Sequence, residues 1–403
     1  MPKATKKFKT LSLLGPAFVA AIAYVDPGNF ASNLTAGSEY GYLLLWVVVA
    51  ANLMAGLVQY LSAKVGLVTG QSLPELVRHK LPKRAIIMYW LQAELVAAAT
   101  DIAEVLGGAI ALKLLFNLPL IAGGLIAGLA SILLLMIQGR RGQKTFERVM
   151  FGLLLIIPIG FIAGLILRPA HVNGLLQGLI PGFRGQNSLL LATSILGATV
   201  MPHVIYLHSA LARDRHGRAR SDKLKSLLKT TKIDVGLAML IAGGVNIAML
   251  LLAAAALRGA AGTSSLAGAY QAFNHFINPL VATLFAVGLL VSGLASTSVG
   301  CYAGSVIMGG LMRRQIPIIV RRLITLLPAL TIIAAGVSPT KALVLSQVVL
   351  SFGIPLAIIP LVKLTNSKKI MGEFVNRRLA ASVAWLATAA IMALDCLLVV
   401  FVF

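Results

Sequence analysis

Charged residues are scarce in this chain, and acidic ones are scarcer still. Only 12% of the 403 residues are charged, whereas soluble domains carry roughly a quarter. Asp and Glu together number 12, against 35 Lys and Arg. Hydrophobic residues make up 58%, and the mean hydropathy is +0.91. This composition excludes an ordinary soluble domain and is typical of a protein that crosses a membrane many times.

Cysteine is rare, and the common catalytic motifs are missing. Cys301 and Cys396 lie in apolar stretches without a CxxC pair or a His/Cys cluster, which argues against a disulfide framework and a structural zinc site. HExxH, P-loop and GxSxG signatures are absent, so ATP-driven and hydrolytic chemistry has no support. We therefore expect no resident cofactor and no enzymatic activity.

Long apolar stretches are abundant instead. A helix needs about 20 mostly apolar residues to cross a bilayer, and this rule predicts an all-α polytopic membrane protein with eleven spans in one transmembrane domain, residues 1–403. The basic N-terminus resembles a signal peptide, but the apolar stretch after it runs past cleavable length and contains Asp26, so we interpret it as a retained first span. The predicted spans are 11–37, 42–68, 85–115, 119–138, 146–167, 189–212, 233–257, 273–312, 316–337, 342–362 and 380–403.

The positive charge is concentrated in alternate loops. With eleven spans the termini lie on opposite faces, and 30 of the 35 Lys and Arg residues fall in or beside the loops on the side of the N-terminus. Because cytoplasmic loops carry the excess of Lys and Arg, we expect a plasma (inner) membrane protein with a cytoplasmic N-terminus and an extracytoplasmic C-terminus. The net charge of +23 then reflects topology rather than nucleic-acid binding. The expected surroundings are the lipid bilayer, without an obligatory protein partner.

Two spans contain helix-breaking sequences. The first carries DPGN at 26–29, and the sixth carries MPH at 201–203. Proline removes a backbone donor and clashes with the preceding turn, so both helices should unwind there. Unpaired backbone groups are costly in lipid, and such a break is tolerated only where it lines a cavity or is buried in protein. The alternative is that Pro27 and Pro202 merely kink packed helices.

The two breaks lie five spans apart. Since five is an odd number, two five-span units that begin at spans one and six must be related by inverted topology, as in many secondary transporters. We expect the first repeat to cover residues 11–167 and the second 189–362, with 380–403 as an extra eleventh helix. The unwound segments would then face each other near the midplane and form a cation site.

The polar groups around the breaks are potential metal ligands. They are the Asp26 carboxylate, the Asn29 amide oxygen, the Met201 thioether and freed carbonyls such as those of Ala23 and Ala198. Oxygen ligands alone suit Mg²⁺, Ca²⁺ or Mn²⁺, whereas a thioether shifts the preference toward transition metals. Methionine in an apolar helix is more often core packing than a ligand, but the place of Met201 in the break paired with Asp26 favours a ligand.

The two broken spans also carry a family resemblance. AYVDPGNF and GATVMPHVIYLHS match signatures of the Nramp (natural resistance-associated macrophage protein) family of divalent metal transporters, and span count and order match along essentially the whole chain. The resemblance implies a LeuT-like fold and proton-coupled uptake of Mn²⁺ and Fe²⁺, with Cd²⁺ as a further candidate. Relatives that carry Mg²⁺ replace the methionine, so Met201 argues against Mg²⁺, which holds its hydration water tightly. The metal ligands that the family resemblance implies are Asp26, Asn29, Met201 and the backbone carbonyls of Ala23 and Ala198.

Span three contains three carboxylates, Glu94, Asp101 and Glu104. Each would cost roughly 2.5–3.5 kcal/mol or more if it faced lipid ionised, so they should face protein or water. Asp101 lies about 20° from Glu94 and about 60° from Glu104 around a helix, which makes one acidic stripe about 15 Å long. The resemblance implies that Asp101 and Glu104 serve a proton pathway with Asp26 as acceptor, and that Glu94 continues a network toward arginines. The alternative is a set of buried salt bridges, for which the basic partners are Arg213, Arg215, Arg321 and Arg322.

Three further polar residues in the spans have more than one interpretation. His203 and His208 lie about 140° apart on a helix, so they cannot both bind an ion held at Met201. We expect His203 to tune the site, the proton path or the helix break, and His208 to line the inner exit. Gln347 falls where the family has a polar residue that can approach the metal, and its alternative role is a hydrogen bond between helices.

Three other functions stay open at this point. A Na⁺-coupled amino-acid symporter of the same architecture would offer backbone amides to a carboxylate substrate, which does not explain why Asp26 and Met201 converge. A Mg²⁺ carrier of the same family is disfavoured by Met201. An intramembrane metalloenzyme would need at least three strong metal ligands, an open water position and a general base.

Overall fold

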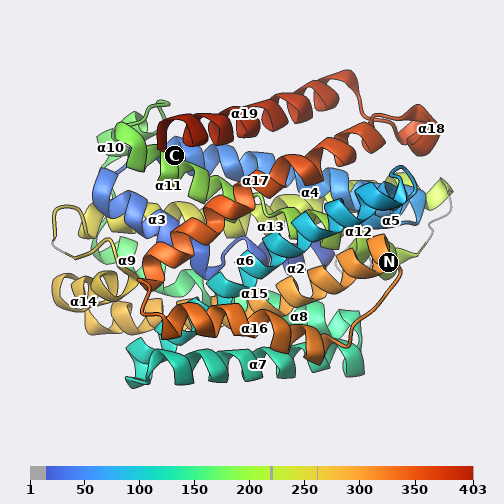
Figure 1. Ribbon diagram of the computed structural model, residues 1–403. Coiled ribbons are helices and arrows are strands. Elements are labelled where there is room, and N and C mark those ends of the chain that lie inside the picture. Colours follow the sequence, from blue (N-terminus) through green and yellow to red (C-terminus); the bar gives the residue numbers. More distant parts are fainter. Residues whose placement is uncertain (1–14, 218–220, 261, 403) are drawn as a thin grey trace, which may run out of the picture.

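The long helices of this protein lie side by side in one bundle (Figure 1). The computed structural model describes residues 15–217, 221–260 and 262–402, and within these ranges every regular element is a helix. Eight segments are long and apolar enough to cross a membrane, which confirms the all-α, multi-span prediction. They comprise α4 (Leu45–Thr69), α6 (Lys83–Phe116), α8 with α9 (Gln143–Ile156 and Pro158–Leu167), α11 with α12 (Gly185–Thr199 and Pro202–His216), α13 (Ser221–Ala256), α15 (Pro279–Met312), α17 (Pro339–Thr365) and α19 (Arg378–Val402).

The other three predicted spans are not among these eight segments. The first is divided into α2 (Pro16–Ala23) and α3 (Pro27–Tyr40), and its residues 11–14 lie outside the described ranges. The fourth is α7 (Leu120–Arg141), and the ninth is α16 (Ile318–Ala334). The number of eleven spans therefore stays a prediction.

Both predicted helix breaks are present. Helix α2 ends at Ala23 and α3 begins at Pro27, which occupies the first helical turn where a missing N–H costs nothing. Helix α11 ends at Thr199, and α12 begins at Pro202 in the same way. The unwound segments are 24–26 and 200–201. The breaks thus follow directly from the two prolines.

The predicted eighth span, at 40 residues, is divided at its start. Helix α14 (Leu266–Phe276) ends before Asn278, whose side chain accepts a hydrogen bond from the N–H of Leu280 and so caps α15. Pro279 occupies the first turn of α15. The crossing helix is therefore shorter than the apolar stretch from which it was predicted.

Several contacts between helices have a counterpart in which the two predicted five-span units exchange places. Helix α3 packs against α13, while α12 packs against α4. Helix α7 packs against α15, while α16 packs against α6. If each span corresponds to the span five later, the contact between spans 1 and 7 corresponds to the contact between spans 6 and 2. The contact between spans 4 and 8 corresponds in the same way to the contact between spans 9 and 3. This exchange is compatible with two five-span units, whose inverted arrangement stays a prediction. Helix α19 lies against α17 and α11 (Figure 1).

The outer helices present large apolar side chains to their surroundings. Leu129 of α7 and both Leu386 and Val400 of α19 are more than half exposed. Exposed apolar surface on this scale is what a bilayer covers. Short helices lie at the two ends of the bundle, with α10 (Val172–Gly178) and α14 at one end and α5 (Leu73–Arg78) and α18 (Lys368–Met371) at the other (Figure 1).

Candidate metal centre

The two helix breaks are joined by hydrogen bonds between predicted metal ligands. Asp26 caps α3, because its Oδ1 accepts from the Asn29 N–H (2.8 Å) and from Asn29 Nδ2 (2.9 Å). Asn29 Nδ2 also donates to the carbonyl oxygen of Ala198 at 2.9 Å. Three of the predicted ligands therefore lie together where α3 meets α11, although Ala198 follows Asn29 by 169 residues in the sequence.

The centre has a free carboxylate oxygen and a buried thioether. Within the described ranges, Asp26 Oδ2 is buried and has no hydrogen-bond partner. Met201 is fully buried in the second break, directly before α12, and Ala23 is the last residue of α2 at the first break. An ionised carboxylate in an apolar interior requires a compensating positive charge. A cation at Asp26 would supply it.

The unwound backbone of the first break is held by side chains that the sequence analysis missed. Asn246 of α13 donates through Nδ2 to the carbonyl of Tyr24 at 2.8 Å, and Ser292 of α15 donates to the carbonyl of Val25 at 2.5 Å. These bonds satisfy two carbonyls that the break removes from the helix ladder. The available signal was an isolated polar residue, such as Asn246, within an otherwise apolar span.

Gln347 of α17 lies against both breaks. A Cβ at Gly28 would overlap the amide of Gln347, and a Cβ at Gly197 would overlap its backbone carbonyl. Glycine is therefore required at position 197, where the contact is with backbone, whereas a Cβ at position 28 would displace the Gln347 side chain. The side chain is buried, and Gln347 Oε1 has no partner among the described residues. This placement keeps Gln347 next to the centre.

Replacing Gly197 with alanine is expected to destabilise the protein by roughly 1–3 kcal/mol, because the new methyl group would force α11 away from the backbone of α17. Thermal unfolding in detergent measures the effect. Gly236→Ala in α13 is the matched control, since a Cβ there meets nothing within 4 Å and alanine favours a helix. Unchanged stability in Gly197→Ala would contradict the close packing of α11 on α17.

The acidic stripe of α6 is paired with arginines of α16 at two of its three positions. Arg321 bonds both carboxylate oxygens of Glu94, at 2.9 and 2.6 Å, and Arg322 Nη1 lies 3.1 Å from Asp101 Oδ1. Arg322 and Asp101 are almost completely buried. Neither oxygen of the buried Glu104 has a partner in the part of the chain that the structure describes. Glu104 is thus the member of the stripe whose charge is least compensated.

The other two predicted arginines pair elsewhere, which corrects the expectation that all four serve the stripe. Both lie in the last turn of α12. Arg213 bonds Glu75 of α5 (2.6 Å) and Asp214 (2.7 Å), while Arg215 lies 3.6 Å from Glu147 of α8. The pKa of Glu75 is lowered overall, because hydrogen bonds from Ser72 and the charge of Arg213 outweigh the raising effect of burial.

The two histidines of α12 have different partners. His203 Nδ1 lies 3.4 Å from the hydroxyl of Thr100 on α6, and His208 Nδ1 lies 2.7 Å from Gln59 Oε1 on α4. Gln59 in turn donates to the hydroxyl of Tyr24. His208 is therefore connected to the first break through Gln59, a link that the sequence analysis did not foresee. A polar residue in the apolar second span was its only signal.

Comparison with known proteins identifies relatives along nearly the whole chain. A family model described as natural resistance-associated macrophage protein-like (Nramp) matches residues 17–401. The divalent metal cation transporter MntH of Mycobacterium tuberculosis is 59% identical over 388 residues, covering 96% of this chain and 91% of that protein. The protein of the same name from Bacillus subtilis is 48% identical over 392 residues, covering 97% and 92%.

Solved structures show the same architecture. A manganese transporter of Eremococcus coleocola, crystallised with an aromatic bis-isothiourea substituted compound, matches with a TM-score of 0.87 at 32% identity, covering 98% of this chain and 87% of that one. Mhp1, a nucleobase-cation-symport-1 family transporter, matches with a TM-score of 0.63 at 14% identity, covering 96% and 90%, and so shares the LeuT-like fold alone. Because the family model and these relatives span almost all of its length, the chain belongs to the Nramp family and is a membrane transporter rather than an enzyme.

Proposed function

We propose that this protein carries divalent transition-metal ions, Mn²⁺ and also Fe²⁺, across the plasma membrane into the cytoplasm together with protons, by alternating access. The observation that carries the proposal is the junction of the two helix breaks. There Asn29 bonds both Asp26 and the carbonyl of Ala198, and Asp26 keeps a buried oxygen without a partner among the described residues. The proposed ligands are Asp26, Asn29, Met201, Ala23 and Ala198, with Gln347 beside them.

The relatives support a metal ion as substrate. The two bacterial relatives are named divalent metal cation transporters, and the solved structure that matches at 32% identity is a manganese transporter. The ligand chemistry favours the same class, since a thioether combined with oxygen ligands suits transition metals better than Mg²⁺. Cd²⁺, a soft ion, is a further candidate on the same ground.

The proposed proton pathway leads from the centre along α6. Asp101 and Glu104 would carry protons, with His203 between α6 and the second break and Glu94 at the end of the stripe nearest the start of α6. The ion pairs with Arg321 and Arg322 support this role, because they allow ionised carboxylates to exist inside the bundle. The same pairs would also stabilise the packing of α16 on α6.

Uptake into liposomes tests the function. Purified protein is reconstituted, and entry of Mn²⁺ and internal pH are followed by two dyes in the same vesicles. The proposal expects Mn²⁺ entry with acidification and poor entry of Mg²⁺. Equal entry of Mg²⁺ would indicate the Mg²⁺ carrier, and sodium-dependent uptake of amino acids would indicate the symporter. The absence of any metal entry would contradict the proposal.

Replacing Met201 with alanine should weaken the discrimination against Ca²⁺ and Mg²⁺ more than it weakens Mn²⁺ transport. Competition by Ca²⁺ against Mn²⁺ uptake is expected to rise roughly tenfold, equivalent to about 1.4 kcal/mol, because hard ions gain when a thioether is lost while Mn²⁺ also accepts oxygen ligands. Met150→Ala is the control, since Met150 is equally buried but belongs to α8 rather than to either helix break. Unchanged competition by Ca²⁺ in Met201→Ala would remove Met201 as the selectivity element.

A further inference from the structure

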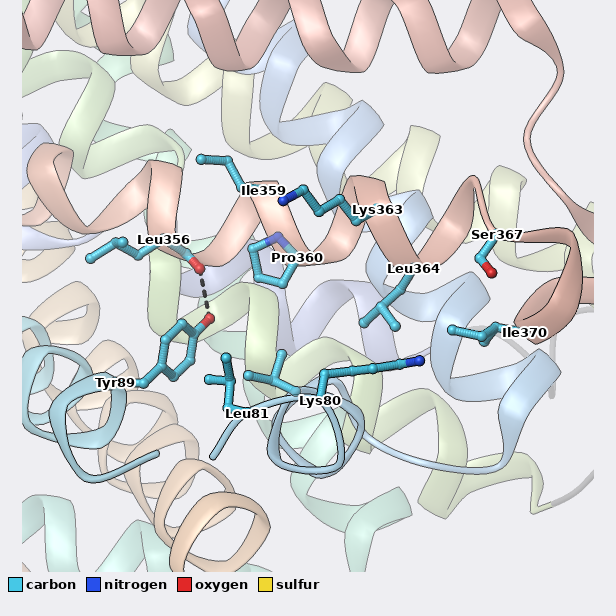
Figure 2. Close-up of a pocket in the computed structure, with 11 residues that line it drawn as sticks. Lys80, Leu81, Tyr89, Leu356, Ile359, Pro360, Lys363, Leu364, Ser367 and Ile370 are labelled. Atoms are coloured by element: carbon cyan, nitrogen blue, oxygen red, sulfur yellow. Dashed lines mark hydrogen bonds between the residues drawn. The ribbon is translucent and has the colours of Figure 1, made fainter. Parts of the chain in front are cut away.

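A cavity apart from the metal centre lies between the start of α6 and the end of α17. Its volume is about 490 Å³. One wall comes from the segment that joins α5 to α6, and the other from α17 and the start of α18 (Figure 2). Its lining includes Val77 of α5 and Ile370 of α18, two helices that lie at the same end of the bundle (Figure 1). The predicted topology places this end on the cytoplasmic side of the membrane, where Lys and Arg are concentrated.

The lining of the cavity combines apolar walls with positive charge. Eleven described residues line it, most of them apolar, such as Leu81, Leu356 and Ile370. Two are lysines, Lys80 on one wall and Lys363 on the opposite one, and none of the eleven is acidic (Figure 2). A matching ligand has an apolar chain and an anionic group.

One wall is hydrogen-bonded to the second broken helix. Pro360 has no N–H, so the carbonyl of Leu356, four residues earlier, loses its helical donor. The hydroxyl of Tyr89 donates to this carbonyl at 2.6 Å (Figure 2), and the hydroxyls of Tyr89 and Tyr206 lie 2.6 Å apart. Tyr206 belongs to α12, which begins directly after Met201. An occupant of the cavity would therefore contact a wall that is bonded to α12.

We propose that this cavity binds an anionic glycerophospholipid from the leaflet on the side of α5 and α18. An acyl chain packs along Leu81, Leu356 and Ile370. The exposed side chains of Lys80 and Lys363, which point in different directions in Figure 2, turn toward the phosphate and neutralise it. Basic pockets between membrane helices on the cytoplasmic side recognise anionic headgroups in this way. The apolar walls distinguish a lipid from a free phosphate, which would leave them uncovered.

Native mass spectrometry of the purified full-length protein tests the site. The wild type is expected to retain phosphatidylglycerol in preference to phosphatidylcholine, and Lys80→Gln with Lys363→Gln should reduce that retention by roughly tenfold or more. Lys229→Gln with Lys232→Gln is the matched control, since it removes the same charge from exposed positions near the start of α13 that do not line the cavity. The control pair should retain the lipid as the wild type does.

Four results would overturn the proposal. They are no preference for phosphatidylglycerol in the wild type, full retention in the Lys80/Lys363 double variant, displacement of the lipid by inorganic phosphate, and a second copy of the chain bound in place of the lipid. The last two would assign the cavity to a free anion or to an interface between protomers. The recorded masses separate these occupants directly.

Because Tyr89 links the cavity wall to α12, a lipid bound in the cavity should affect transport. This consequence rests on the proposed metal transport. Mn²⁺ uptake should be faster in liposomes that contain phosphatidylglycerol, and Tyr89→Phe should lose that dependence while it still retains the lipid, because only the hydroxyl links to Leu356 and Tyr206 are removed. Lipid retention without Mn²⁺ uptake in any lipid would contradict the proposed transport and leave the lipid site intact. Equal lipid dependence in Tyr89→Phe would contradict the link through Tyr89.

Discussion

Replacing Asp26 with alanine is expected to abolish Mn²⁺ binding, with a loss of at least about a hundredfold in affinity, or roughly 2.7 kcal/mol. Asp26 supplies the only carboxylate among the proposed ligands, and its Oδ2 is the buried oxygen that has no partner in the described ranges. Its other oxygen orients Asn29 through two hydrogen bonds. The substitution therefore removes one ligand and disorders a second. Isothermal titration calorimetry of the purified protein measures the loss.

A second substitution at Asp26 separates the effect of its charge from that of its size. Asp26→Asn keeps the size of the side chain and should also lose most of the affinity, because the negative charge is what compensates the cation. Asp395→Asn is the control, since Asp395 is a buried carboxylate of α19 whose described bond is to Ser351. That control should bind Mn²⁺ as the wild type does. Binding of Mn²⁺ by Asp26→Ala at wild-type affinity would place the metal site elsewhere.

Replacing Asp101 with asparagine is expected to separate metal binding from proton movement. No proposed metal ligand is lost, so Mn²⁺ affinity should fall modestly, within roughly fivefold, as the field of a nearby anion is removed. Metal-linked acidification should fall about tenfold or more, because a member of the acidic stripe can no longer exchange a proton. Both are measured in the same liposomes, and Glu104→Gln should give a weaker version.

The ion pair with Arg322 sharpens this test. Asp101→Asn leaves a buried guanidinium without its carboxylate, which costs about 3–5 kcal/mol of stability. Arg322→Gln in the same chain removes that unpaired charge, so the double variant should recover stability in thermal unfolding but not acidification. Recovery of both would show that Asp101 acts only as a structural partner of Arg322. Full acidification in Asp101→Asn and in Glu104→Gln would show that protons take another route, such as one through His203.

The membrane class, the two breaks and the types of ligand could all be predicted from the sequence. Each follows from a local property: hydropathy over about 20 residues, the missing N–H of Pro27 and Pro202, and the donor atoms of Asp26 and Met201. The number of eleven spans stays a prediction, because α2 and α3 are each too short to cross alone, and the ends of a span are harder to predict, since the apolar stretch before Met312 begins with the separate helix α14. Hydropathy does not register such divisions.

The sequence by itself determined that this protein is a many-span membrane protein with two unwound helices, and it supplied oxygen and sulfur side chains as candidate ligands, since these features depend on residues close together in the chain. Only the tertiary structure decided which partners those residues meet. It bonds Asn29 to Ala198, holds the first break with Asn246 and Ser292, and pairs the acidic stripe with two arginines of α16. Arg213 and Arg215 were equally available by charge, but α12 ends beside Glu75 and Glu147 instead. These choices depend on which helix faces lie side by side between segments far apart in sequence, and hydrophobic periodicity does not specify that arrangement.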